Sequence, residues 1–233
     1  PAVRRIVQPL SPAHTIGVLN ALLRRRDGAA LGTAPRVWVA GCGTQQGTTW
    51  SVALPEADVL ATDVSQETLA AARSVASRVG ARARFERHDL GDDAAPAGGR
   101  AFDLIVCTGV VHHLASPISG LRGIRDGLAP GGAAVVMVYS RAHRSALEPL
   151  RRAAVELARG ADDPYAVACS VLAAARGEQA QPLGRHLVEA LWQMRLADRS
   201  FVADVLLNPR EATYEVDELL ALLRDAGLRF VEW

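Results

Sequence analysis

Short apolar runs alternate with amphipathic helical segments between Arg36 and Tyr139, and this alternation restricts the fold more than any other feature of the sequence. Apolar runs bounded by turn residues are typical of strands buried in a parallel sheet. A regular strand–helix alternation indicates a doubly wound α/β sheet, whose ligand-binding loops lie at the carboxyl ends of the strands. The strands that we predict are Arg36–Ala40, Asp58–Thr62, Ala83–Glu86, Phe102–Cys107 and Ala133–Tyr139.

Two of the intervening helices carry clear boundary signals. Ser65 and Ser116 are placed as N-caps, and Pro117 stands at the first helical position after Ser116. Gly80 lies where the helix that follows Ser65 should end, and Pro130-Gly131-Gly132 should break the chain before the fifth strand.

The pattern divides the chain into three parts. Residues 1–35 form an N-terminal segment with one predicted helix, about Ala13 to Arg26, and residues 141–213 show helical patterns without a strand. The α/β pattern returns at 214–233, with a helix that Gly227 ends and a sixth strand, Leu228–Trp233. We therefore predict a Rossmann-like domain of residues 36–140 and 214–233, interrupted by a helical insertion that acts as a cap over the substrate cleft.

Three sequence signals mark the helices of the insertion. They are the apolar stripe of Leu147, Leu150, Ala154 and Leu157, the start signal Asp163-Pro164, and the apolar residues Leu187, Leu191 and Met194. The insertion also carries four arginines near its start, Arg141, Arg144, Arg151 and Arg152. They form either an anion-binding face or an ordinary solvated helix surface, and the formal net charge of +1 favours the solvated surface.

Composition excludes several classes of protein. The net charge gives no general attraction to nucleic acid or to a membrane surface. No apolar run approaches the roughly 20 residues of a transmembrane helix, and Pro1–Leu10 lacks the apolar stretch of a secretory signal. The chain has no lysine, which excludes a Schiff-base lysine, and its three scattered cysteines favour a reducing cytoplasm over a disulfide framework or a zinc site.

The first candidate site is the glycine-rich bend Gly41-Cys42-Gly43 after the first strand. Glycines let a backbone approach a ligand closely, and the helix N-terminus that follows favours an anionic group. Asp63 ends the second strand 20 residues after Gly43, where a nucleotide-binding sheet places an acid for ribose hydroxyls. The alternatives are a tight turn without a ligand and an aspartate that only caps a helix, and these two features do not distinguish NAD from other nucleotides.

Three further segments narrow the choice: His88-Asp89-Leu90, Cys107-Thr108-Gly109-Val110-Val111-His112-His113-Leu114, and Leu128-Ala129-Pro130-Gly131-Gly132. With the glycine bend and Asp63, they occur in the order and approximate spacing found in class I S-adenosylmethionine (SAM)-dependent methyltransferases. The chain resembles this family over residues 36–140 and 214–233. The resemblance implies a SAM-binding domain of Rossmann-like fold.

The resemblance also implies roles for individual residues. Gly41, Cys42 and Gly43 would lie along the methionine part of SAM, Asp63 would bind the ribose diol with Val64 against the adenine, and Asp89 would accept from the adenine amino group under Leu90. Cys107, Thr108 and Gly109 would contact the methionine portion near the sulfonium. Two positions depart from the family: Ala40 stands where an acid usually ends the first strand, and Gln45 replaces the third glycine.

Methyl transfer is a displacement at a carbon that the sulfonium already activates, so the protein must align the acceptor and, where needed, remove its proton. His112 and His113 are candidate bases because imidazole titrates near neutral pH, although they can also simply pack the loop. Tyr139 is a further candidate for orienting the acceptor. No cysteine or acid lies at ligand spacing around the histidines, so we predict no metal.

These observations predict a methyltransferase acting on a small molecule at O, N or C. The alternatives are an NAD(P)-dependent oxidoreductase, against which the segments at His112-His113 and Pro130-Gly131-Gly132 argue, and a SAM-fold binding protein without catalysis, which Ala40 and Gln45 leave open. Sheets of this family usually have a seventh strand beside the sixth. Either the sequence continues past the sixth strand, or another element covers that sheet edge, such as a partner subunit in a homodimer.

Overall fold

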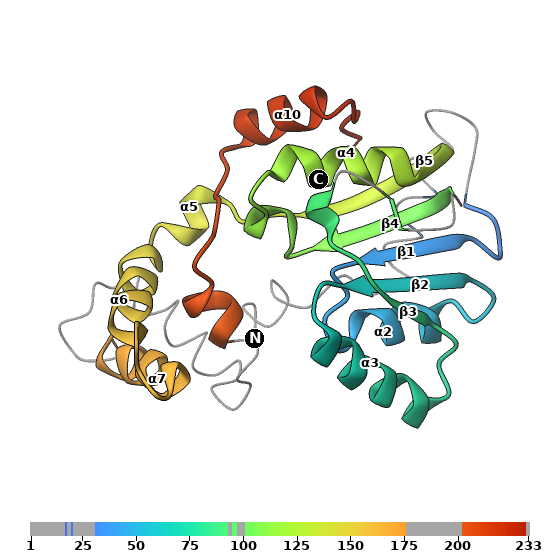
Figure 1. Ribbon diagram of the computed structural model, residues 1–233. Helices are drawn as coiled ribbons and strands as arrows, with labels where there is room; N and C mark the ends of the chain where they lie inside the picture. The colour runs from blue at the N-terminus through green and yellow to red at the C-terminus, as the bar shows by residue number, and fades with distance from the viewer. Residues whose placement is uncertain are drawn as a thin grey trace. The chain divides into compact units, whose positions relative to one another are not determined.

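The chain is divided by its internal contacts into two compact units (Figure 1). The computed structural model describes residues 17, 20, 31–92, 95–96, 101–175 and 202–231. Unit 1 comprises residues 1–138 and 217–233, and unit 2 comprises residues 139–216. Each unit has its own buried core, and each is described below by itself.

Unit 1 is built on a five-stranded sheet in the order β3-β2-β1-β4-β5. Every strand pair in it is parallel, which confirms the predicted doubly wound α/β fold. The strand order reverses direction between β1 and β4, and ligands of such sheets bind in the crevice at this reversal. The strands are β1 (Arg36–Ala40), β2 (Asp58–Asp63), β3 (Arg84–Arg87), β4 (Phe102–Thr108) and β5 (Leu128–Met137).

Helices cover both faces of the sheet (Figure 1). Helices α2 (Gln46–Ala53) and α3 (Gln66–Val79) lie on one face, and α4 (Pro117–Gly127) and α10 (Val216–Asp225) lie on the other. Successive residues of β1 point to opposite faces, so Trp38 packs in one core cluster with Leu121 of α4, while Val37 and Val39 pack in the other with α2 and α3. A strand buried on both faces explains the continuous apolar run of β1.

The predicted helix boundaries are confirmed. The Ser65 hydroxyl accepts a hydrogen bond from the backbone N–H of Thr68 at 3.1 Å, as an N-cap does. Gly80 ends α3 in the left-handed conformation, with φ of 68°. Ser116 caps α4, and Pro117 is its first residue.

Two strand predictions were wrong. β5 begins at Leu128 rather than Ala133, because Leu128 already pairs with Phe102. The register shifts before the next pair, Leu104 with Ala133, so residues 129–132 of β5 form a bulge. A bulge accommodates Pro130, which has no N–H to donate. The described part of the predicted sixth strand, residues 228–231, has no regular secondary structure. Leu228 is partly buried and packs against the core cluster around Trp38.

Unit 2 is helical over its described residues. Its elements are α5 (Arg141–Arg144), α6 (Glu148–Ala158), α7 (Pro164–Ala175) and a π-helical turn, η4 (Ala203–Leu207). Leu147, Ala154 and Leu172 pack with Val205 and Leu206 in its core. The prediction that Leu157 belongs to the same apolar stripe was wrong: Leu157 is 64% exposed, because the inward face of α6 continues at Ala158. A single bridge between Ser140 and Tyr214 joins the two ends of the unit.

Helix α7 starts at Asp163-Pro164 as predicted: Pro164 is its first residue, and the Asp163 side chain accepts from the N–H of Tyr165 at 3.1 Å. The predicted helices at Ala13–Arg26, apart from the helical residues Gly17 and Asn20, and around Leu187 lie outside the described residues. Within the part of the chain that is described, no helix is long and apolar enough to cross a bilayer.

Candidate cofactor site

The carboxyl ends of four adjacent strands meet at one edge of the sheet in unit 1. The register pairs Ala40 of β1 with Thr62 of β2, and Asp63 with Arg87 of β3. On the other side, Val39 pairs with Val106 of β4. Because parallel strands end at the same edge, the glycine bend, Asp63, the segment at Asp89 and Thr108 all reach the edge where the strand order reverses.

The glycine bend is tightly held on one side and open on the other. Gly41 has φ of +66°, and a Cβ at this position would collide with the side chain of Val110, which follows β4. Gly43 has φ of +54°, but no atom of the described residues lies within 4 Å of the place that its Cβ would take. The structure therefore needs glycine at 41 for backbone packing, and leaves open space beside the backbone of Gly43.

Asp63 connects this bend to β2. Its Oδ2 accepts from the backbone N–H of Gly43 at 3.1 Å, and its Oδ1 accepts from the N–H of Ser65 at 3.0 Å. Each carboxylate oxygen has a second lone pair for a further donor. The side chain is half-buried, so the carboxylate is fixed by two backbone bonds and can still accept from a diol.

The residues expected around the adenine fit an amino-substituted ring. Asp89 is exposed, and its Oδ1 accepts from the N–H of Gly91 at 2.8 Å. Its Oδ2 has no hydrogen-bond partner among the described residues, which leaves an acceptor for an amine. Leu90 is 5% exposed and belongs to the core, whereas Val64 is a large apolar side chain with 53% of its surface exposed. Of the two, Val64 offers the open apolar surface.

A hydrogen bond between two chain segments closes the site on the β4 side. The Thr108 hydroxyl, at the end of β4, donates to the Gln46 amide oxygen at 2.9 Å. Gln46 is the first residue of α2, immediately after the bend. Sequence reasoning missed Gln46 and Val110; the position of Gln46 at the helix start was the only local signal for it.

The two cysteines of the site are core residues. Cys42 and Cys107 are both fully buried, and burial is the main cause that raises the pKa of each thiol to about 12. The side chain of Cys107 lies in the core, so only its backbone is placed to reach a cofactor. Gly109 follows with φ of 80°, and its N–H donates to the carbonyl of Met137 at 3.2 Å.

The departures from the family pattern have structural explanations. The Ala40 side chain is fully buried in the core cluster around Trp38, so this position faces the core. Gln45 has φ of −130°, which any residue adopts, so a glycine is not required there.

The candidate bases differ in their surroundings. His112 is fully buried, His113 is half-buried, and their ring centroids lie 4.2 Å apart on a short turn after β4. Tyr139 belongs to unit 2, where its hydroxyl donates to Asp204 at 3.4 Å and the Arg144 guanidinium lies 4.3 Å from its ring centre. Burial is the main cause that raises the Tyr139 pKa. The structure therefore groups the histidines with the cofactor residues in unit 1 and places Tyr139 in another cluster.

A family model described as a methyltransferase domain matches residues 38–134, from β1 into β5. An uncharacterised protein of Synechococcus sp., syc1184_c, is 31% identical over 204 residues, which cover 84% of this chain and 48% of that protein. Two solved structures of PKMT2 from Rickettsia typhi share the fold. The one in complex with AdoHcy is 18% identical over 96% of this chain and 44% of its own, with a TM-score of 0.69; the other is 19% identical over 94% and 41%, with a TM-score of 0.62. The chain thus spans about half the length of these relatives.

Proposed function

Since this chain carries a domain of the class I SAM-dependent methyltransferases, we propose that the protein transfers the methyl group of SAM to a small-molecule acceptor. The observation that supports this most is the carboxylate of Asp63, fixed by the N–H groups of Gly43 and Ser65 beside the open space at Gly43. That arrangement suits a ribose diol attached to a chain that runs along the bend.

The cofactor would be held by residues from all four strand ends. Asp63 would accept from the ribose hydroxyls, and Asp89 from the adenine amine above Val64. The backbone at Gly41 and Gly43 would lie along the methionine portion, with Gln46 and Thr108 at its far end. When bound, SAM supplies a methyl group already activated by its positive sulfur.

The protein's own contribution would be alignment and exclusion of water, which contribute several kcal/mol in favourable cases. Where the acceptor carries a proton, His113 is the better candidate for its removal, because it is half-buried and follows β4 at the same edge. The fully buried His112, whose ring lies against that of His113, would hold its neighbour in place.

A net charge of +1 supports a small acceptor over nucleic acid. We propose that unit 2 contributes the acceptor selectivity, since it follows β5 directly in the chain. A polypeptide acceptor is the second candidate, because two solved structures that match almost the whole chain are of PKMT2. We also propose that the protein forms a homodimer and works in a reducing cytoplasm. Light scattering of the purified protein tests the homodimer.

The experiment uses SAM with a tritiated methyl group and fractions of a cell extract separated by mass. Label that enters a fraction below about 1 kDa supports the proposed acceptor class, and label only in protein supports the second candidate. Thermal shifts with SAM, AdoHcy and NAD(P) run in parallel. Stabilisation by NAD(P) alone would contradict methyl transfer, and stabilisation by SAM without any labelled product would favour a binding protein without catalysis.

A further inference from the structure

Unit 2 contains a groove whose residues have no assigned role in the proposed methyl transfer. Its volume is about 610 Å³, and charged side chains dominate its lining. The lining residues that carry the argument are Arg141, Arg144, Arg152, Glu148, Glu211 and Thr213. All belong to unit 2, so the groove is defined by this unit alone.

A buried ion pair forms one wall of the groove. The side chains of Arg144 and Glu211 are 6% and 2% exposed. Nε and Nη2 of Arg144 donate to the two carboxylate oxygens of Glu211, and Nη2 also donates to the carbonyl of Val205 at 2.9 Å. The pair is neutral as a whole, and Nη1 of Arg144 is left without a hydrogen bond among the described residues.

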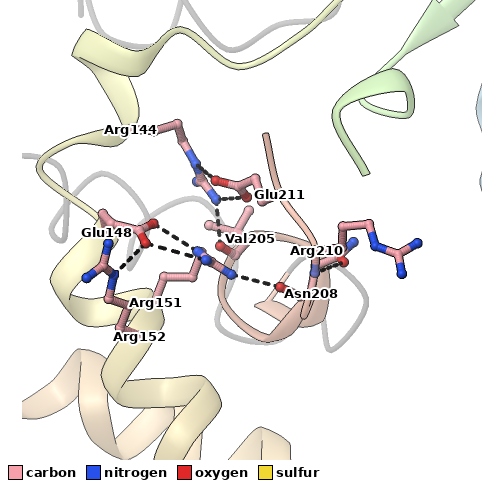
Figure 2. A network of polar contacts seen from close by, with 8 residues as sticks. All are labelled: Arg144, Glu148, Arg151, Arg152, Val205, Asn208, Arg210 and Glu211. Atoms are coloured by element: carbon pink, nitrogen blue, oxygen red, sulfur yellow. Dashed lines mark hydrogen bonds and ion pairs between the residues drawn. The ribbon is translucent and has the colours of Figure 1, made fainter. Parts of the chain in front are cut away.

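Glu148, elsewhere in the lining, is shared by two arginines, of which Arg152 lines the groove and Arg151 lies behind it in the fold. Figure 2 shows the guanidinium groups of Arg151 and Arg152 converging on the single carboxylate of Glu148. Their Nε atoms donate to it at 3.0 and 2.8 Å. The hydrogen bond from Arg151 is the main cause that lowers the pKa of Glu148. Glu148 therefore stays ionised at neutral pH, and two positive charges share one negative charge.

The two arginines that share Glu148 have different tasks. Arg151 also donates from Nη1 to the carbonyl of Asn208 at 2.9 Å, which fixes it within the fold (Figure 2). Among the described residues, Arg152 is bound through Nε alone, and its side chain is 77% exposed. Its Nη1 and Nη2 have no partner among the described residues. Glu148 thus orients a guanidinium whose free edge can bind a ligand.

We propose that this groove binds an oxyanion, a carboxylate or phosphate group, through the free Nη atoms of Arg152 and Nη1 of Arg144. A guanidinium edge presents two parallel donors that match such a group. Both carboxylates of the lining are already occupied by arginines, and Arg141 is paired with Glu215 at 3.8 Å, so one positive charge remains in excess. Because Arg152 is held by Glu148 in advance, less side-chain freedom is lost when the anion binds.

The first test measures binding of inorganic phosphate and of succinate by titration calorimetry, with sodium chloride keeping the ionic strength constant. Arg152→Ala should weaken the binding at least about tenfold, the effect of losing about 1.4 kcal/mol. Arg159→Ala is the matched control, because Arg159 is 74% exposed, pairs with Glu156 at 3.2 Å and does not line the groove. It should leave the affinity unchanged. Binding of phosphate, of succinate or of both identifies the anion.

The second test maps the site chemically. Phenylglyoxal modifies accessible arginines, and mass spectrometry of peptides measures the modification of Arg152 and Arg159 separately. The bound anion should protect Arg152 and leave Arg159 reactive. Failure of both anions to bind beyond sodium chloride, equal affinity in Arg152→Ala, or equal protection of the two arginines would overturn the proposal.

Discussion

The backbone N–H of Gly43 donates to Oδ2 of Asp63 at 3.1 Å. This bond joins the bend after β1 to the end of β2, 20 residues further along the chain. The acid that we assign to the ribose diol is therefore also part of the structure of the glycine bend. Cofactor binding and the local conformation of the bend should respond together when Asp63 is changed.

Replacement of Asp63 by asparagine tests that link. An amide nitrogen cannot accept, so one of the two backbone N–H groups loses its partner, at about 1–3 kcal/mol when the donor is buried. We expect SAM affinity to fall at least about tenfold, since hydrogen bonds to charged groups contribute about 1.5–3 kcal/mol. Titration calorimetry measures the affinity. Asp58→Asn is the control: Asp58 begins the same strand and pairs with Arg84 at 2.9 Å, so its loss should not change SAM binding.

Replacement of Gly43 by alanine separates strain from occupation of the site. Gly43 and Gly80 have φ of +54° and +68°, and in the part of the chain that the structure describes no atom lies within 4 Å of the place that a Cβ would take at either residue. Alanine at either site should lower the free energy of unfolding by about 1 kcal/mol, because left-handed backbone disfavours a Cβ. Only Gly43→Ala should also weaken SAM binding, because its Cβ enters the space that we assign to the cofactor. Equal SAM affinity in the two variants would contradict this placement.

The hydrogen bond from Thr108 to Gln46 predicts a third result. Thr108→Val keeps the shape and removes the donor, which leaves the Gln46 amide free to turn. We expect an increase in the KM for SAM with a smaller change in kcat, because we assign Thr108 to the methionine end of the cofactor and not to the acceptor. Thr108→Ser keeps the hydroxyl and should restore the KM. A loss of kcat alone in Thr108→Val would assign the residue to the chemical step instead.

The buried pair of Arg144 and Glu211 should stabilise unit 2. Glu211→Gln leaves a guanidinium that is 6% exposed without its counter-charge, and breaking such a pair typically costs about 3–5 kcal/mol. Denaturant unfolding followed by circular dichroism measures this loss. Glu156→Gln breaks an exposed pair with Arg159, and its effect should stay below about 1 kcal/mol. Similar losses in the two variants would show that burial does not determine the contribution of the Arg144 pair.

The thiols predict a labelling pattern. Because burial raises the pKa of Cys42 and Cys107 to about 12, both remain protonated and inaccessible at pH 8. Cys169 is only half-buried. A disulfide reagent should therefore modify one thiol per folded chain at pH 8 and all three after denaturation. Rapid modification of Cys107 in the folded protein would contradict its place in the core.

Much of unit 1 could be predicted because its signals are local. Ser65, Gly80 and Ser116 each mark a helix end through a hydrogen bond or a dihedral angle within a few residues. The start of β5 could not be predicted in this way. Pro130-Gly131-Gly132 indicates a break, and only the pairing of Leu128 with Phe102, a contact distant along the chain, shows that the strand begins before it.

The same distinction applies to the sites. The glycine bend and the acids at the ends of β2 and β3 follow from motif and spacing. Gln46 was missed because its partner, Thr108, is 62 residues away. The arginines of the insertion were assigned either to an anion-binding face or to a solvated surface, and neither interpretation anticipated that Glu211, 67 residues from Arg144, forms a buried pair with it.

Calorimetric titration of the purified protein with SAM, AdoHcy and NAD⁺ tests the central claim most directly. The arrangement of Asp63, Asp89 and the open bend at Gly43 predicts one site per chain for SAM and AdoHcy, no heat with NAD⁺, and loss of the SAM signal in Gly43→Ala but not in Gly80→Ala. Binding of NAD⁺ in place of SAM, or SAM binding that Gly43→Ala leaves unchanged, would contradict it.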